Sequence, residues 1–521
     1  MVWSACVPIH NYVSVSLDKH LARCKVMIFA KSPMLGWRFE MQLRHSILYL
    51  LAHGIPALAA FLTLAVYTRW ISPEAYGIYS TLLIVANSAN IILFNWFYVA
   101  LLRYWTDSDF KQTELISLLL LVLLMGSGLI LLGAASYFAV THDGLMALAL
   151  AGLMISNAWY MAYQRINSAS LQVEHYLKIE LMRVVVTTLL AISLVYLGYS
   201  WYGILLATTL GFIVPLVFRH FWQNFCHYPT QLKPAKALSL LHYGLPLSLT
   251  FILLEIVHAT DRVLLSWLVG FEAAGQYAVA FSLPFQLLIL VGSAINAAFY
   301  PLILQILAQQ GETAAKEKLA DYFLILLGLL LPSYFGLLAV SHDFMPLLIG
   351  DAYLAESLRL LPSMGLLLVL NAIYLFHTSL AFQLAKQTYK PILVVGVAAL
   401  LNIVLNLILI PIYQVEGAVM ASLVAYVVCI IYGNFLGAKA FKLPVLWLEL
   451  IKIIAAAGLM LMVLSYLTIG YGWVEGLIRI LVGILVYSSA IYLLNVANIR
   501  YYLLNFFKSL YKPNESTHYS A

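Results

Sequence analysis

Long apolar runs alternate with short polar connections along most of the chain. A helix that crosses a bilayer needs about 20 mostly apolar residues. We therefore predict an all-α polytopic membrane protein with about fourteen transmembrane helices, at residues 46–68, 78–102, 115–140, 144–166, 177–198, 201–222, 240–269, 276–300, 322–341, 358–384, 390–411, 416–438, 444–469 and 474–495. No connection is long enough for a folded domain outside the membrane. The charged, helix-prone stretch from Gln309 to Tyr322 is expected to form a linker helix at the cytoplasmic surface.

Charge in the connections predicts the orientation of these spans. Alternate connections hold mainly Lys and Arg, and the connections between them hold mainly Asp and Glu, with Arg69, Arg359 and Arg479 as exceptions near span ends. Because basic connections stay in the cytoplasm, both termini are expected there. Arginines near span ends are expected to extend toward the lipid headgroups; these are Arg69, Arg103, Arg165 and Arg183.

The sequence contains an internal repeat. With a shift of 198 residues, Glu74–Tyr79 (EAYGIY) matches Glu272–Tyr277 (EAAGQY), and a polar stripe at i, i+7 and i+10 follows in both copies. The stripes are Ser88, Asn95 and Tyr98, and Gln286, Ser293 and Asn296. Upstream, Gly54–Pro56 resembles Gly244–Pro246 with a shift of 190, and further along 203–208 resembles 417–422. These matches predict two related halves.

The repeat divides the chain into two bundles of six helices. An even number of spans per half keeps both copies in the same orientation, which implies a pseudo-two-fold axis along the membrane normal and a cavity between the halves. The predicted parts are a cytoplasmic segment 1–45 (with Met41 as an alternative start), a first bundle 46–222, a linker 223–239, a second bundle 240–438, two appended helices 444–495 and a cytoplasmic tail 496–521.

Composition supports this class and excludes others. Of the 521 residues, 63% are hydrophobic and 10% are charged, whereas soluble domains carry about 25% charged residues. The net charge of +6 is explained by the cytoplasmic leaflet rather than by nucleic acid. The four cysteines show no metal-binding spacing, and no phosphate-binding G-x-x-x-x-G-K-[ST] loop occurs. We find no catalytic constellation and no metal site, so a transporter is predicted rather than an enzyme.

Several of these motifs resemble one known family. The Gly54–Pro56 start, the EAxGxY turn, the stretch TDRVLLSWLVGFEAAGQY from Thr260 and NLILIPIYQVEGAVMASLV from Asn406 resemble the polysaccharide-repeat-unit flippases. This is the O-antigen and capsule type of the multidrug/oligosaccharidyl-lipid/polysaccharide exporter superfamily. The resemblance covers about residues 42–495. It implies the two-bundle exporter fold and movement of an undecaprenyl-diphosphate-linked oligosaccharide across the inner membrane, together with a polysaccharide polymerase and other assembly proteins as partners. It implies no cofactor, but a proton or Na⁺ as coupling ion.

Other functions are also compatible with the sequence. A cation-coupled multidrug exporter and a peptidoglycan-precursor flippase belong to the same superfamily. The mixed acidic and basic stripe of the seventh span does not favour organic cations. A polysaccharide polymerase or ligase acts on the same lipid but resembles proteins with a sizeable external loop, and here the external loops are short.

The seventh span carries the main candidate residues. Ser248, Glu255 and Arg262 repeat every seven residues on one helical face, with His258 between the last two and Asp261 beside them. Ionisable groups inside a membrane are costly and are functional candidates. Arg262 is expected to bind the diphosphate of the cargo, and Glu255 or Asp261 to carry a coupling proton or cation. The alternative is that these charges form fixed ion pairs between helices. His258 either bridges Glu255 and Arg262, or each side chain has a partner on another helix.

Further candidates line the expected cavity and its cytoplasmic mouth. The two polar stripes (Ser88, Asn95, Tyr98; Gln286, Ser293, Asn296) offer neutral groups for sugar hydroxyls. His53 lies in the first span, where bonding to a neighbouring helix is the alternative role. Arg44 and Arg103 lie where an anionic headgroup would enter, and their alternative role is only to orient the spans.

Overall fold

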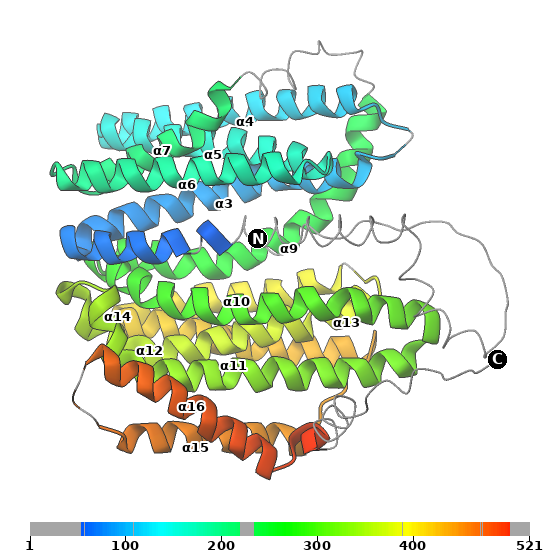
Figure 1. The fold of residues 1–521 in the computed structure, drawn as a ribbon. Coiled ribbons are helices and arrows are strands. Elements are labelled where there is room, and N and C mark those ends of the chain that lie inside the picture. Colours follow the sequence, from blue (N-terminus) through cyan, green and yellow to red (C-terminus); the bar gives the residue numbers. More distant parts are fainter. Residues whose placement is uncertain are drawn as a thin grey trace, which may run out of the picture. The chain divides into compact units, whose positions relative to one another are not determined.

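The chain is helical wherever the structure describes it. The computed structural model describes residues 54–56, 58–107, 109–218, 234–387, 389–468, 470 and 472–500, and Figure 1 shows helices and no strands in these parts. Twelve of the described helices are long and apolar enough to cross a membrane. The protein is therefore a multi-pass membrane protein. The helices are one over residues 58–70, then α3 (Pro73–Tyr104), α4 (Gln112–Thr141), α5 (Gly144–Ala169), α6 (Val173–Tyr196), α7 (Ser200–Val217), α9 (Pro234–Leu268), α10 (Phe271–Gln310), α11 (Glu312–Leu348), α12 (Asp351–Ile373), η1 (Tyr374–Thr378), α13 (Leu380–Leu384), α14 (Lys390–Ala438), α15 (Trp447–Tyr466), α16 (Trp473–Leu493) and η2 (Val496–Asn498).

The helix count agrees closely with the predicted fourteen spans. α14 has 49 residues and contains a break at Gln414, whose backbone is non-helical at φ 50° and ψ −122°. Pro411, three residues earlier, lacks the N–H that would continue the helical hydrogen bonds. The two halves of α14 therefore correspond to the two spans predicted at 390–411 and 416–438. The helix over 58–70 is the later part of the first predicted span, whose beginning lies outside the described residues.

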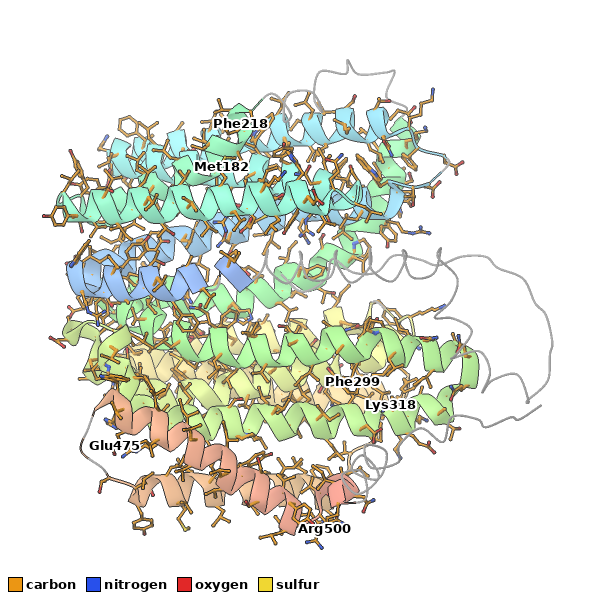
Figure 2. The ribbon with its side chains drawn as sticks, in the orientation of Figure 1. Met182, Phe218, Phe299, Lys318, Glu475 and Arg500 are labelled. Atoms are coloured by element: carbon orange, nitrogen blue, oxygen red, sulfur yellow. The ribbon has the colours of Figure 1, made fainter. Side chains whose placement is uncertain are left out.

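The connection predicted between the spans 276–300 and 322–341 is wrong, because the helices continue through it. α10 extends to Gln310 and α11 starts at Glu312, so a single residue, Gly311 with φ 87°, joins them. At about 1.5 Å per residue, the 40 residues of α10 exceed the roughly 30 Å hydrocarbon core. Polar helix-forming residues extend both helices beyond the apolar part, and no separate linker helix forms. Figure 2 shows Phe299 and Lys318 side by side on this hairpin, with the ammonium 5.8 Å from the ring centre.

The connection between the spans predicted at 322–341 and 358–384 is also mostly helical. α11 reaches Leu348 and α12 begins at Asp351, so only Ile349 and Gly350 separate them. Hydropathy predicts these helices too short at both ends, because it does not detect the polar residues that extend a helix beyond its apolar part.

The described chain forms two compact units. The first contains the residues up to 63 and 82–248, and the second contains 64–81 and 249–500. In the first unit, α5, α6 and α7 pack closely, and Gly211 of α7 lies so near Thr187 of α6 that a Cβ would be 1.9 Å from its Oγ1. α3 and α9 each contribute residues to both units.

The two copies of the EAxGxY motif contact each other inside the second unit. A Cβ on Gly77 would lie 1.7 Å from the carbonyl oxygen of Phe271, and a Cβ on Gly275 would lie 2.0 Å from that of Pro73. Each glycine thus meets the carbonyl group four residues before the other glycine. This reciprocal contact explains why the glycine occurs in both copies: the first turns of α3 and α10 cross backbone against backbone.

The weaker match between 203–208 and 417–422 marks similar bends in the two halves. Gly203 follows a turn at Gly198, and a Cβ there would lie 2.8 Å from Cβ of Tyr199. Gly417 follows the break at Gln414, and a Cβ there would lie 2.3 Å from the carbonyl oxygen of Leu409. In each half, the glycine allows two consecutive spans to turn back closely.

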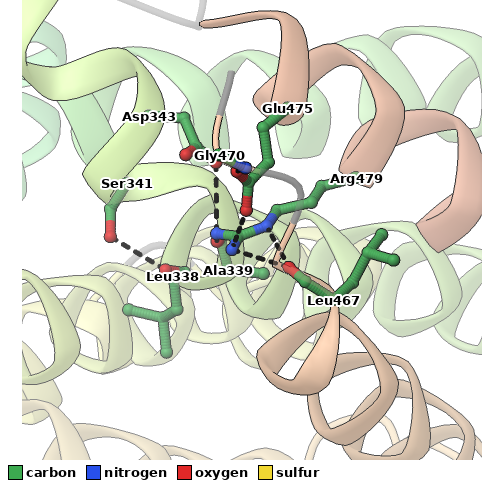
Figure 3. A network of polar contacts seen from close by, with 8 residues as sticks. All are labelled: Leu338, Ala339, Ser341, Asp343, Leu467, Gly470, Glu475 and Arg479. Carbon is green, nitrogen blue, oxygen red and sulfur yellow. Dashed lines mark hydrogen bonds and ion pairs between the residues drawn. The ribbon is translucent and has the colours of Figure 1, made fainter. Parts of the chain in front are cut away.

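The appended helices α15 and α16 are held to α11 by a buried arginine (Figure 3). Arg479 of α16 donates hydrogen bonds to Asp343 Oδ2 at 3.2 Å, to the carbonyl of Ala339 at 3.1 Å and to that of Leu467 at 2.8 Å. It also pairs with Glu475, which accepts from the backbone N–H of Gly470. The charges of the appended pair are thus satisfied within the second unit.

Candidate functional site

Asp261 is the centre of the most polar buried cluster in the second unit. Its side chain on α9 is 2% exposed and accepts hydrogen bonds from Tyr277 Oη and Ser422 Oγ at 2.6 Å, from Asn406 Nδ2 at 2.8 Å and from Asn402 Nδ2 at 3.2 Å. The donors come from α10 and from both halves of α14, and all are neutral. Asp261 forms no ion pair with any described residue. For Asp261, the fixed ion pair that the sequence left open is therefore not the arrangement found among the described residues.

The cluster is rich in oxygen atoms that can bind a hard cation. Asn406 Oδ1 is buried and no described residue donates to it, while Asn402 Oδ1 accepts from Asn406 at 3.1 Å. Together with the Asp261 carboxylate and the Ser422 hydroxyl, these are the oxygen ligands that hard cations take. Among the described residues no group of three His, Cys, Asp or Glu could hold a metal ion. The cluster therefore suits a proton or a small hard cation rather than a transition metal.

Arg262, the next residue on α9, contacts Phe281 of α10 and forms no ion pair with Asp261 among the described residues. Successive helical residues are about 100° apart around the axis, and the Arg262 guanidinium lies over the ring of Phe281, 5.2 Å from its centre. Its Nε is buried and has no hydrogen-bond acceptor in the described part of the chain. A buried donor without an acceptor costs about 1–3 kcal/mol, and more when charged. An anionic ligand at this point would remove that cost.

His258 and Glu255 lie one and two turns before Arg262 on α9. His258 Nε2 is 3.2 Å from the Tyr426 hydroxyl and 3.5 Å from Asn371 Nδ2. Of the two arrangements left open by the sequence, His258 adopts the one with partners on other helices. Glu255 is partly buried and close enough to Tyr426 to interact with it electrostatically. The seventh span therefore contributes acidic, basic and imidazole groups to the interior of one unit.

The polar stripe of α3 contributes mostly to packing. Asn95 Nδ2 donates to Ser248 Oγ at 3.3 Å, which brings together two predicted site residues within the first unit. Tyr98 is 2% exposed and donates to the carbonyl oxygen of Ala158 on α5 at 2.8 Å. Ser88 donates to its own helix at Ile84. Tyr98 thus binds a backbone carbonyl of its own bundle.

The polar stripe of α10 includes a buried acceptor to which no described residue donates. Gln286 Oε1 is buried without a described donor, whereas Asn296 Oδ1 accepts from Tyr322 at 3.3 Å and Ser293 donates to the carbonyl of Leu290. Gln286 is the member of this stripe that retains an unused acceptor.

Three predicted site residues remain, of which one is exposed and two are not described. Arg103 is exposed in the last turn of α3. Arg44 and His53 lie outside the described residues.

The first unit contains a charged cluster that was not predicted from the sequence. Arg183 and Glu180 of α6 form an ion pair, and Glu180 also accepts from Tyr160 and from Gln164 of α5. The expectation that Arg183 extends to the headgroups is wrong, because α6 starts at Val173 and places it about 15 Å into the helix. Its guanidinium lies 5.6 Å from the ring centres of both Tyr160 and Phe212. Two opposite charges three residues apart inside an apolar run were the available signal.

None of the four donors to Asp261 was assigned to the site from the sequence. Asn402 and Asn406 lie four residues apart in an apolar span, and Ser422 lies in the next one. The i, i+4 spacing shows that the two asparagines share a helix face, but nothing local indicates that this face meets Asp261.

Solved structures with the same fold define the class of this protein. "Lipid II flippase MurJ, inward closed conformation" aligns with a TM-score of 0.69 over 87% of this chain and 100% of that chain, at 17% identity. An outward-facing multidrug resistance MATE family transporter of the MOP superfamily aligns with a TM-score of 0.51 over 77% and 96%, at 16% identity. A MOP superfamily transporter from Pyrococcus furiosus gives 0.50 over 77% and 96%, also at 16%. The protein has the fold of the MOP transporter superfamily, as predicted.

Within that class, the family is given by a sequence match. A family model described as "Polysaccharide biosynthesis protein" matches residues 66–358, and the chain belongs to this family. No curated protein matches the chain.

Proposed function

We propose that this protein is a flippase that translocates an undecaprenyl-diphosphate-linked oligosaccharide repeat unit across the bacterial cytoplasmic membrane. The cargo belongs to the synthesis of a surface polysaccharide such as O-antigen, capsule or exopolysaccharide. The observation that carries the proposal is the buried, unpaired Nε of Arg262 in a membrane protein of a polysaccharide biosynthesis family. Membership of the MOP fold supports a transporter rather than an enzyme.

Arg262 is proposed to bind the diphosphate. Guanidinium N–H groups form strong charge-assisted hydrogen bonds with phosphate oxygens, and the Phe281 ring leaves the in-plane N–H groups available. Gln286, with its unused acceptor, is the stripe residue of this unit best suited to sugar hydroxyls. Glu255 and His258, which lie on α9 with Arg262, complete the proposed cavity wall.

Asp261 is proposed to bind the coupling proton or Na⁺. No described residue forms an ion pair with the Asp261 carboxylate, whose hydrogen-bond donors are all neutral, so a bound proton or cation would balance its charge. The unused Asn406 Oδ1 supplies a further oxygen ligand. Binding there would favour one arrangement of α9, α10 and α14, which is how an ion gradient can drive a transport cycle.

The proposed orientation places both termini in the cytoplasm. It rests on the alternation of basic and acidic connections. The lipid-linked substrate would enter from the cytoplasmic leaflet, and a polysaccharide polymerase and other assembly proteins would be the partners on the other side.

Deletion of the gene tests the proposal. We expect loss of surface polysaccharide and accumulation of its lipid-linked unit in the cytoplasmic leaflet, both reversed by the wild-type gene. Arg262→Ala and Glu255→Gln should fail to restore export, whereas Arg359→Gln, which changes an exposed ion pair, should restore it. Normal polysaccharide in the deletion strain, or full export by both site variants, would refute the proposal.

A peptidoglycan-precursor flippase is the second candidate function. It is favoured by the fold match to the lipid II flippase, which covers more of this chain than the MATE structures do. The gene would then restore growth to a cell depleted of its own lipid II flippase, and its deletion would leave surface polysaccharide unchanged. A cation-coupled multidrug exporter has no comparable support, because Arg262 would repel a cationic drug.

A further inference from the structure

Three aromatic side chains form a ladder on one face of α10. Tyr277, Phe281 and Phe285 are spaced by four residues, so they lie one above another. The rings of Tyr277 and Phe281 are stacked at 6.1 Å with an interplanar angle of 13°, and those of Phe281 and Phe285 at 5.1 Å and 24°. The three rings therefore form one stacked row along α10.

Phe281 contacts two of the candidate residues on α9. The Arg262 guanidinium lies 5.2 Å from its ring centre, and the His258 ring meets it edge-on at 6.4 Å. Tyr277, one turn earlier, donates its hydroxyl to Asp261. The ladder is therefore anchored at one end by the Asp261 cluster and carries Arg262 on its middle ring.

An arginine without such a support would be a poor receptor for an anion. Immobilising its long side chain costs up to about 2 kcal/mol of conformational entropy. A cation over an aromatic face gains about 0.5–1 kcal/mol when exposed and about 2 kcal/mol or more when desolvated. The Arg262 guanidinium lies over the face of the ring, and its buried Nε has no acceptor among the described residues.

We propose that Phe281 is the positioning residue of the anion site: its face holds the Arg262 guanidinium in the orientation that receives the diphosphate. This role rests on the proposed function, because it requires Arg262 to bind an anion. Phe281 does not contact the anion itself, and it acts through Arg262. Phe285 has a similar ring on the same ladder and no recorded contact with Arg262, so it provides a matched control.

The test uses the purified full chain in detergent with inorganic pyrophosphate as the probe, and measures the dissociation constant by calorimetry. Phe281→Leu should weaken binding about 10-fold, since 1.4 kcal/mol corresponds to a factor of ten. Phe281→Tyr, which keeps the aromatic face, should restore affinity to within about 2-fold of wild type. Phe285→Leu should leave the affinity unchanged, and thermal denaturation of each variant reports folding.

Fluorinated phenylalanine at position 281 separates the electrostatic role from packing. Fluorine withdraws charge from the ring face and nearly preserves its size, so stepwise fluorination should weaken pyrophosphate binding in steps. The same replacement at 285 should have no effect. Unchanged affinity through the series at 281 would overturn the proposal, even if Phe281→Leu does not fold.

Combination with Arg262→Met distinguishes this role from the proposed function. If Phe281 acts through Arg262, Phe281→Leu has no further effect once Arg262 is replaced. An equal loss in both backgrounds would overturn the positioning role and leave the anion site intact. If Arg262→Met alone leaves pyrophosphate binding unchanged, the anion site itself is refuted.

Discussion

Each of the three basic residues that break the charge alternation has fixed partners in the second unit. Arg69 donates to the carbonyl oxygens of Pro346 and Leu347, in the last turn of α11, where a cation also interacts favourably with the helix dipole. Arg359 pairs with acidic residues of α12 and α14, and Arg479 pairs with acidic residues of α11 and α16. The charges of Arg359 and Arg479 are neutralised by nearby acids and that of Arg69 is stabilised by carbonyl oxygens, which explains how they fit the side predicted to be acidic.

Arg479 and Arg359 give a matched comparison of buried and exposed ion pairs. The Arg479 side chain is 13% exposed and that of Arg359 is 53% exposed. Removing one partner of a buried pair costs about 3–5 kcal/mol, whereas an exposed pair contributes about 0–1 kcal/mol. We expect Arg479→Met to lower the thermal denaturation midpoint clearly and Arg359→Met to change it little. Equal midpoints for the two variants would contradict the structural role of the buried network.

Asp261 should confer the ion dependence of stability. Asp261→Asn keeps the size of the side chain and removes its charge. The wild-type protein should be stabilised against thermal denaturation by Na⁺ over K⁺ at constant ionic strength, or by a change in pH, and the variant should lose that dependence. Asp261→Ala removes the acceptor of four hydrogen bonds, leaves the buried hydroxyls of Tyr277 and Ser422 without one among the described residues, and should be destabilised by more than about 3 kcal/mol. An ion response that persists in Asp261→Asn would place the coupling site elsewhere.

At the scale of elements, the crossing of α3 and α10 depends on two glycines. Gly77→Ala and Gly275→Ala each place a methyl group within 2.0 Å of a carbonyl oxygen, so the first turns must separate. Overpacking of this kind typically costs about 1–3 kcal/mol. Thermal denaturation should show both variants to be less stable. Gly128→Ala on α4, where nothing lies within 4 Å of the new Cβ, is the control and should match wild type or exceed it.

The break in α14 shows how one element serves the candidate site. Pro411 and Gln414 separate two apolar halves, and the chain turns back at Gly417. The first half provides Asn402 and Asn406, and the second provides Ser422. Because of the turn, donors from two consecutive spans reach the same carboxylate.

At the scale of the whole molecule, the second half contains the buried acid with neutral partners. In the first half, the buried acid Glu180 is paired with Arg183. An ion pair of fixed partners has no need of a further cation, whereas Asp261 has an unbalanced charge. This difference is the reason for placing the proposed coupling site in the second unit, although the repeat relates the two halves.

The sequence alone determined the class of protein, the approximate positions of its spans and the internal repeat. It could do so because the membrane requires about 20 apolar residues per span, and because helices in lipid satisfy their backbone hydrogen bonds locally. Hydropathy and glycine motifs therefore predict the spans and the repeat without knowledge of distant contacts. Helix ends were less accurate, as α10 and α11 show, since hydropathy does not detect polar helical turns.

Only the tertiary structure decided which polar side chains meet. Asp261 is bonded to residues 141 to 161 positions later in the chain, and no local pattern encodes such a pairing. Tyr98 and Arg183 belong to the interior of the first bundle for the same reason: the rotation and packing of each helix decide whether a polar group meets a partner. The unpaired Nε of Arg262 became visible only when every neighbour was in place, because an unsatisfied hydrogen bond is a property of the whole surroundings of an atom.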